Sequence, residues 1–230
     1  LCRVKKTKGI FKMEKTIVIR GIGSAAAAPD IIEIAIVLNA TDVDYQRTMT
    51  MAANQYARIC AVLTPLGFSK KDLKTTMFNV DTQYENMPDG HGGYKRCFNG
   101  YHCAHALRLE FGFSMQRLAQ VLTYLSRSEA KPEFSIKFTV KQSDTLHAKA
   151  LMAATANAYR NATVLTKASR TVLGEIILIE YGAKQALPYS PTSFGNGSRA
   201  AMLMSADNHI EMQPEDVSIE ESVNITWSLQ

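Results

Sequence analysis

The stretch Asn99-Gly-Tyr-His-Cys-Ala-His-Ala-Leu-Arg-Leu-Glu-Phe-Gly-Phe113 lies near the middle of the 230-residue chain and alternates in polarity like a long strand. Successive side chains of a strand point to opposite faces, so every second residue here shares a face. The more apolar face consists of Tyr101, Cys103, His105, Leu107, Leu109 and Phe111, and the other carries His102, Ala104, Ala106, Arg108 and Glu110. We therefore predict a half-buried strand around which the neighbouring elements are arranged.

The sequence on either side of this strand predicts a hairpin and then a helix. A strand-like segment over residues 72–84 is followed by a loop over 87–93 that is rich in proline and glycine, so the return arm begins near Tyr94. Ser114 is expected to cap a short helix. The apolar stripe of that helix is Leu118, Leu122 and Leu125.

The remaining elements follow from the same periodicities. Strands are expected over 15–21, 30–40, 134–141, 175–181 and 217–229, and long helices over 41–66, capped by Thr41-Asp42, and from 143 or 144 to 172. The pair Gly21-x-Gly23 lacks the third glycine of a dinucleotide-binding motif, and Pro29 follows instead of a helix. We therefore expect a bend there, between the first two strands.

The order of these elements predicts an α+β fold, with a largely antiparallel, mixed sheet packed against three helices. A strand-helix-strand unit occurs twice, over 31–84 and over 101–140, which suggests a pseudo-repeat. We expect a single domain over residues 14–230, with a long irregular loop at 183–214 that is rich in Pro, Gly and Ser.

The net charge of +5 comes from the start of the sequence. Residues 1–13 hold five basic residues before the first acid, Glu14, and the remaining 21 basic residues equal the 21 acidic ones. We expect a disordered or artefactual tail there and no nucleic-acid partner, because no aromatic residues for base stacking accompany a basic surface. No leader and no run of about 18 apolar residues is legible, so we expect a soluble protein, cytoplasmic by default, without a transmembrane segment.

Motifs that carry catalysis are missing from the sequence. We find no Gly-x-Ser-x-Gly, His-Glu-x-x-His or phosphate-binding loop. We therefore expect no enzymatic activity, no catalytic residue and no cofactor. Asp30 and Asp72 have positions that turn and cap roles explain without chemistry.

A metal site is the alternative that the histidines and cysteines raise. Cys103 and His105 share a strand face about 6.6 Å apart, which is close enough for both to ligate one ion. Cys97 is too distant unless the chain bends at Gly100, and the sequence nominates no third ligand. We expect both residues to pack on a half-buried face instead. A second set of soft ligands, which copper(I) would accept, is Met202, Met204, His209 and Met212. Here too we favour the simpler interpretation, a flexible loop that happens to contain methionines.

Several of these motifs, in this order, resemble the SIMPL-domain family. They are Gly21-x-Gly23 followed by Pro29-Asp30, the turn Leu66-Gly67 followed by Asp72 and a strand, and Gly100-Tyr101 at the start of the long strand. The alanine-rich helix, the Pro- and Met-rich loop and the final alternating strand complete the similarity, which extends from Lys15 to Leu229.

The resemblance implies an α+β fold, no established enzymatic activity and self-association, in some members into ring- or channel-like assemblies. The family includes bacterial periplasmic and outer-membrane immunogenic proteins and a mammalian signalling adaptor that associates with a pelle-like kinase, and some members are linked to oxidative-stress tolerance. The chain departs from the bacterial pattern by lacking a legible leader. His102, Cys103 and His105 stand where polar or small residues are expected. The hypothesis is a non-enzymatic scaffold or partner-binding protein that forms homo-oligomers; the alternative is a metal-binding or redox-protective protein that uses Cys103 and His105.

Overall fold

The computed structural model describes residues 15–88, 93–182, 188–192 and 213–230. The chain forms two compact units, each with its own antiparallel sheet. The central unit comprises Ala27–Lys141 and Pro188–Val217, and the terminal unit comprises Leu1–Ala26, Gln142–Leu187 and Ser218–Gln230.

The predicted α+β class is confirmed, but the strands lie in two antiparallel sheets rather than in one mixed sheet. Alternation along a strand indicates which of its residues are buried. It does not indicate which other strand lies beside it, so the sequence pattern could not separate the two sheets.

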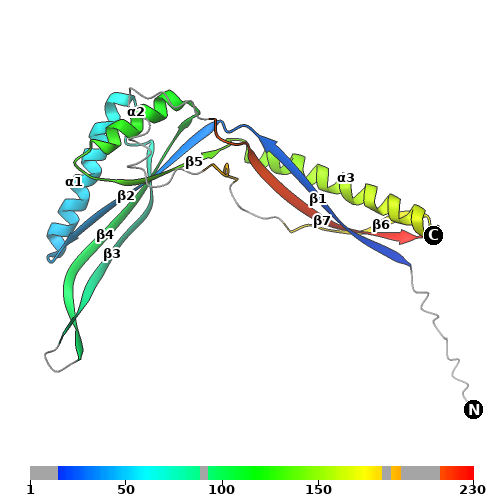
Figure 1. The fold of residues 1–230 in the computed structure, drawn as a ribbon, viewed down its shortest axis with the longest axis horizontal. Helices are drawn as coiled ribbons and strands as arrows, with labels where there is room; N and C mark the ends of the chain where they lie inside the picture. The colour runs from blue at the N-terminus through cyan, green and yellow to red at the C-terminus, as the bar shows by residue number, and fades with distance from the viewer. Residues whose placement is uncertain (1–14, 89–92, 183–187, 193–212) are drawn as a thin grey trace, which may run out of the picture. The chain divides into compact units, whose positions relative to one another are not determined.

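The described residues of the central unit form four strands and two α-helices, shown in Figure 1. In chain order they are β2 (Ile31–Asp42), α1 (Tyr45–Leu63), β3 (Leu73–Pro88), β4 (Tyr94–Gly112), α2 (Met115–Ser126) and β5 (Glu133–Thr139), with a short 3₁₀ turn, η1 (Thr64–Leu66), after α1. The strand predicted over Asn99–Phe113 corresponds to the greater, C-terminal part of β4.

The central sheet has the strand order β3-β4-β2-β5. Strand β4 runs antiparallel to β2, with Ile31 opposite Gly112 and Asp42 opposite Tyr101. Each strand-helix-strand unit therefore encloses one strand of the other: β4 lies between β2 and β3, and β2 lies between β4 and β5. This is a split β-α-β arrangement used twice, and it confirms the predicted pseudo-repeat at the level of topology.

The core of the central unit lies between one face of the sheet and helices α1 and α2. Leu118, Leu122 and Leu125 of α2 are fully buried, as the stripe predicted, and Ser114 caps that helix by accepting a hydrogen bond from the amide of Arg117. The sheet contributes Ile32, Ile34, Ile36 and Leu38 of β2, Leu107 and Leu109 of β4, and Ile136 and Phe138 of β5.

Helix α1 begins later than the sequence predicted. Strand β2 continues through Asp42, and Asp44 is the N-cap residue, whose side chain accepts a hydrogen bond from the amide of Arg47. The expected cap Thr41-Asp42 is therefore wrong. Asp42 has a neighbouring role, since its carboxylate accepts a hydrogen bond from the amide of Asp44.

The terminal unit combines strands from both ends of the described chain with one long helix (Figure 1). Its elements are β1 (Thr16–Ala27), α3 (Ser143–Ser169), β6 (Leu173–Glu180) and β7 (Val217–Leu229), and the sheet order is β1-β7-β6. The core consists of Ile19, Val223, Ile225 and Trp227 from the sheet and Ala154, Ala158 and Ala162 from α3. In the described part of the chain, no helix has both the length and the apolarity that a bilayer crossing requires.

Glycines in β1 allow α3 to lie unusually close to the sheet. A Cβ at Gly21 would collide with the backbone of Ala154 and Ala158, and one at Gly23 with the backbone of Ala150 and Ala154. The bend predicted at Gly21-x-Gly23 is wrong, because β1 runs through both residues. The two glycines leave the sheet without side chains at the positions where alanines of α3 approach it.

Candidate functional site

The predicted pair Cys103 and His105 lies on the helix-covered face of the central sheet. Both residues are buried, Cys103 completely. The Nε2 atom of His105 lies 2.9 Å from the hydroxyl oxygen of Thr75, and its ring stacks on Tyr56 and meets the edge of Phe78 at centroid distances of 5.5 and 5.1 Å. The imidazole is thus enclosed by aromatic rings and has one polar neighbour.

This environment suits packing better than metal binding or thiol chemistry. Burial raises the pKa of the Cys103 thiol and lowers the pKa of His105. A thiol with a raised pKa is a poor nucleophile and a poor ligand, because the thiolate is the reactive form. Among the described residues, no three His, Cys, Asp or Glu side chains come together as metal ligands would.

The other predicted site residues have structural positions or lie outside the described residues. Cys97 is a free thiol on the β3–β4 hairpin, opposite Glu85. The possible soft ligands Met202, Met204, His209 and Met212 are not among the described residues.

The two acids of the family motifs have the turn and cap roles that were expected. One carboxylate oxygen of Asp72 accepts hydrogen bonds from the amide and the hydroxyl of Ser69, at 2.7 and 2.8 Å. The amide hydrogen bond is the largest cause of the lowered pKa of Asp72. Asp30 accepts a hydrogen bond from the amide of Lys141 at 2.7 Å, which joins the start of β2 to the end of β5.

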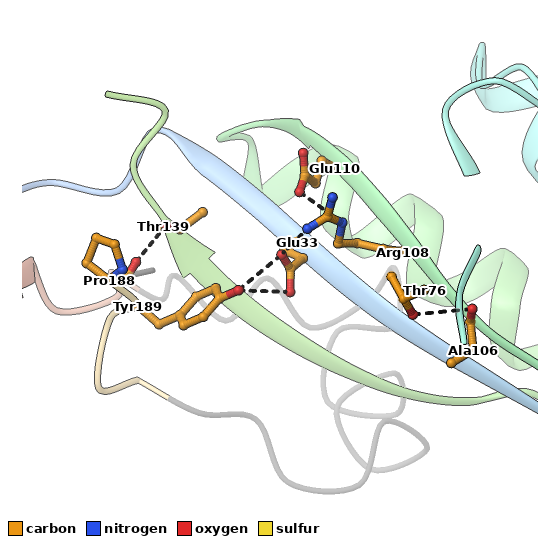
Figure 2. A network of polar contacts seen from close by, with 8 residues as sticks. All are labelled: Glu33, Thr76, Ala106, Arg108, Glu110, Thr139, Pro188 and Tyr189. Carbon is orange, nitrogen blue, oxygen red and sulfur yellow. Dashed lines mark hydrogen bonds and ion pairs between the residues drawn. The ribbon is translucent and has the colours of Figure 1, made fainter. Parts of the chain in front are cut away.

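A charged network that the sequence did not predict lies on the other face of the central sheet (Figure 2). Glu33 of β2 is buried, and its carboxylate accepts a hydrogen bond from the hydroxyl of Tyr189 at 3.3 Å. Arg108 of β4 lies between two acids, 3.8 Å from Glu33 and 3.2 Å from Glu110. Burial, and then the charge of Glu33, raises the pKa of Tyr189.

This network fastens the segment 188–192 to the edge strand β5. Tyr189 forms an isolated bridge with Thr139, whose hydroxyl donates to the carbonyl of Pro188 at 2.6 Å (Figure 2). The segment 213–216 is tied to it, because the hydroxyl of Ser190 donates to the carbonyl of Glu215 at 2.6 Å. The segment thereby covers the end of the free edge of β5, at Phe138 and Thr139, so the role of the network is structural.

A second buried acid lies in the terminal unit. Glu221 interrupts the apolar alternation of β7, and it is buried with one carboxylate oxygen 2.7 Å from Nδ1 of His147 on α3. Burial, and then Glu221, raises the pKa of Tyr181. The exception in the sequence pattern was visible, but its partners come from distant segments and could not be inferred from spacing.

Strand β6 carries the most exposed apolar segment of the terminal sheet. It is an edge strand, and its four consecutive aliphatic residues are each about half exposed: Ile176 at 53%, Ile177 at 49%, Leu178 at 49% and Ile179 at 55%. Natural edge strands are usually shortened, charged or covered, because their unpaired backbone groups and apolar side chains invite another strand. The composition of β6 has few of these safeguards.

The chain is thus an α+β protein whose two sheets carry buried charged clusters and, among the described residues, an apolar edge strand with one neighbour. A family model, SIMPL, described as a protein of unknown function (DUF541), matches residues 17–227. The match covers most of the chain, so the protein belongs to the SIMPL family, and the resemblance drawn from its motifs is confirmed. A comparison with curated proteins gives no match.

Proposed function

We propose that this SIMPL protein is a non-enzymatic module that associates with copies of itself and serves as a scaffold or partner-binding protein. The observation that carries the proposal is the edge strand β6. Four adjacent aliphatic side chains stand about half exposed on a strand that has a neighbour on one side only among the described residues. An open edge strand with exposed apolar side chains is a place where another strand can add to the sheet.

The two clusters of charged residues around Glu33 and Glu221 favour a structural role over a catalytic one. Glu33 and Glu221 are both buried, and each is engaged by a partner that fastens one segment to another. Neither cluster has the nucleophile, base and orienting group that a hydrolytic site needs. A stress-related role is part of the proposal only through the family resemblance.

The proposal is tested by measuring mass against concentration with multi-angle light scattering. We expect the wild-type protein to have a mass that is a multiple of 25.4 kDa and that falls on dilution. Ile177→Lys with Ile179→Lys should move dissociation to concentrations at least about tenfold higher, because two charges would have to be buried on association.

Met152→Lys on α3 is the matched control, since Met152 is 73% exposed on the same unit. We expect it to associate like the wild type. A wild-type mass of 25.4 kDa at every concentration would refute the proposal, and equal effects of the β6 and α3 substitutions would remove β6 as its basis.

A further inference from the structure

The terminal sheet has two edges, and both are open in the described residues. Strand β7 lies between β1 and β6, so each of these has one neighbour among the described strands. The carbonyl of Lys15 accepts a hydrogen bond from the amide of Leu229, so Thr16, Val18 and Arg20 direct their backbone groups away from β7. The open part of β1 ends at Ile22, whose amide donates to the side chain of Asn157 on α3.

The sequences of the two open edges are complementary. Residues 175–180 of β6 read Glu-Ile-Ile-Leu-Ile-Glu, and residues 15–20 at β1 read Lys-Thr-Ile-Val-Ile-Arg. Each is a run of four mostly apolar residues with a charge at both ends, acidic on β6 and basic on β1. All four charged residues are exposed, and none has an ion-pair partner in the described part of the chain.

The directions of the strands determine how the edges of two copies can meet. Both β1 and β6 run antiparallel to β7, so β1 and β6 are parallel to each other within one copy. A second copy that continues the sheet in the same orientation presents its β1 parallel to β6. A parallel pairing that places Glu180 beside Arg20 brings Glu175 to within about one residue of Lys15 along the strand. Lys15 is opposite Leu229, which pairs with Leu173 of β6, and the irregular β6–β7 register leaves Glu175 about one position further along.

Arg20 and Glu180 also lie at matching positions along the strand direction of the sheet. Glu180 lies opposite Asn224 of β7, and Arg20, Asn224 and Glu180 line one shallow depression. Arg20 and Glu180 therefore occupy the same level on the two edges. A neighbouring copy would place its Arg20 one strand spacing, about 4.8 Å, from Glu180 without sliding along the strand.

The alternative pairing of two β6 strands is less favourable. An antiparallel pair centred between Ile177 and Leu178 keeps the aliphatic residues together, but it places Glu175 opposite Glu180 twice. Like charges directly opposite each other destabilise a strand pair.

We infer that the β6 edge of one copy adds, in parallel, to the β1 edge of a second copy, with Glu180 beside Arg20 and Glu175 about one residue along the strand from Lys15. The inference rests on the proposed self-association and names its two surfaces. Because the two surfaces differ, each copy keeps one of them open after pairing. The assembly then grows until it closes as a ring or continues as a filament.

Charge reversal on each edge tests this pairing. Lys15→Glu with Arg20→Glu makes both edges acidic, and Glu175→Lys with Glu180→Arg makes both edges basic. We expect each double variant alone to associate at least about tenfold more weakly than the wild type, since attraction becomes repulsion at two places. An equimolar mixture should recover association, because every acidic edge then meets a basic one.

The control is Lys149→Glu with Arg160→Glu, which makes the same charge change on exposed positions of α3 and should associate like the wild type. Circular dichroism checks that every variant is folded. If the wild type assembles and Lys15→Glu with Arg20→Glu assembles equally well, or if the mixture shows no recovery, the β1–β6 pairing is wrong while self-association stands. A monomeric wild type overturns both.

Discussion

Because α3 lies close to β1, replacing glycine by alanine should lower the free energy of unfolding at Gly21 but not at Gly182. A Cβ at Gly21 would lie 2.7 Å from the Cβ of Ala158 and 2.8 Å from its amide nitrogen, and closer still to the carbonyl oxygen of Ala154. Carbon atoms in contact normally stand about 3.5–4.0 Å apart. Gly21→Ala therefore forces the helix away from the sheet by about 1 Å.

The expected cost follows from overpacking. Inserting a methyl group into a packed core costs about 1–3 kcal/mol, and the upper end applies here because the obstacle is backbone. The loss of flexibility in the unfolded chain returns about 0.4–1 kcal/mol. We expect Gly21→Ala to lower the free energy of unfolding by about 2 kcal/mol, which moves the urea midpoint down by about 1 M.

Gly182→Ala is the matched control in the same unit, because a Cβ there meets nothing within 4 Å. It should leave stability unchanged or raise it slightly. The fluorescence of Trp227, the single tryptophan, reports on both variants, since it is buried in the terminal core beside the alanines of α3. A urea midpoint for Gly21→Ala equal to or above that of Gly182→Ala would refute the account of β1–α3 packing.

Three further predictions concern the buried polar residues. Burial lowers the pKa of His105, so the imidazole binds a proton more readily in the unfolded chain than in the folded one. The free energy of unfolding should therefore fall as the pH drops below about 6.5, by at most about 1.4 kcal/mol per pH unit. In urea unfolding measured over a series of pH values, His105→Phe should make this fall less steep. Tyr189→Phe and Glu33→Leu each remove the hydrogen bond that holds the 188–192 segment. We expect each to cost about 1 kcal/mol or more by chemical denaturation, and the double variant to cost less than their sum. Full additivity would mean that the two residues do not interact. Protein purified without an affinity tag should contain no stoichiometric zinc or copper by elemental analysis, because the Cys103 thiol is buried and its pKa is raised. If one metal ion is bound per chain and is lost in Cys103→Ser, the metal-site hypothesis is restored.

Much of the fold was predictable because it depends on local periodicity. The alternation along β4 identified its buried face, and the leucine stripe with Ser114 located α2 within a residue or two. The start of α1 was misplaced because Thr41, Asp42 and Asp44 are all plausible caps, and the extent of β2 decides among them.

The candidate sites were less predictable because their residues meet through tertiary structure. Glu33 lies 156 positions from Tyr189, and His147 lies 74 positions from Glu221, so no spacing rule links either pair. The pair that spacing did suggest, Cys103 and His105, is adjacent on a strand but faces a core of aromatic and aliphatic side chains. Sharing a strand face brings two residues near each other without giving them further ligands.

The strand order of the terminal sheet also has a consequence for synthesis on the ribosome. Among the described strands of this sheet, the middle one, β7, is made after both β1 and β6. The central unit draws its sheet and both helices from one continuous segment, so it can fold while translation continues. Until β7 emerges, β1 and β6 lack the strand that joins them, and the aliphatic run of β6 is exposed on both sides. We therefore expect nascent chains that stall before β7 to depend most on chaperones.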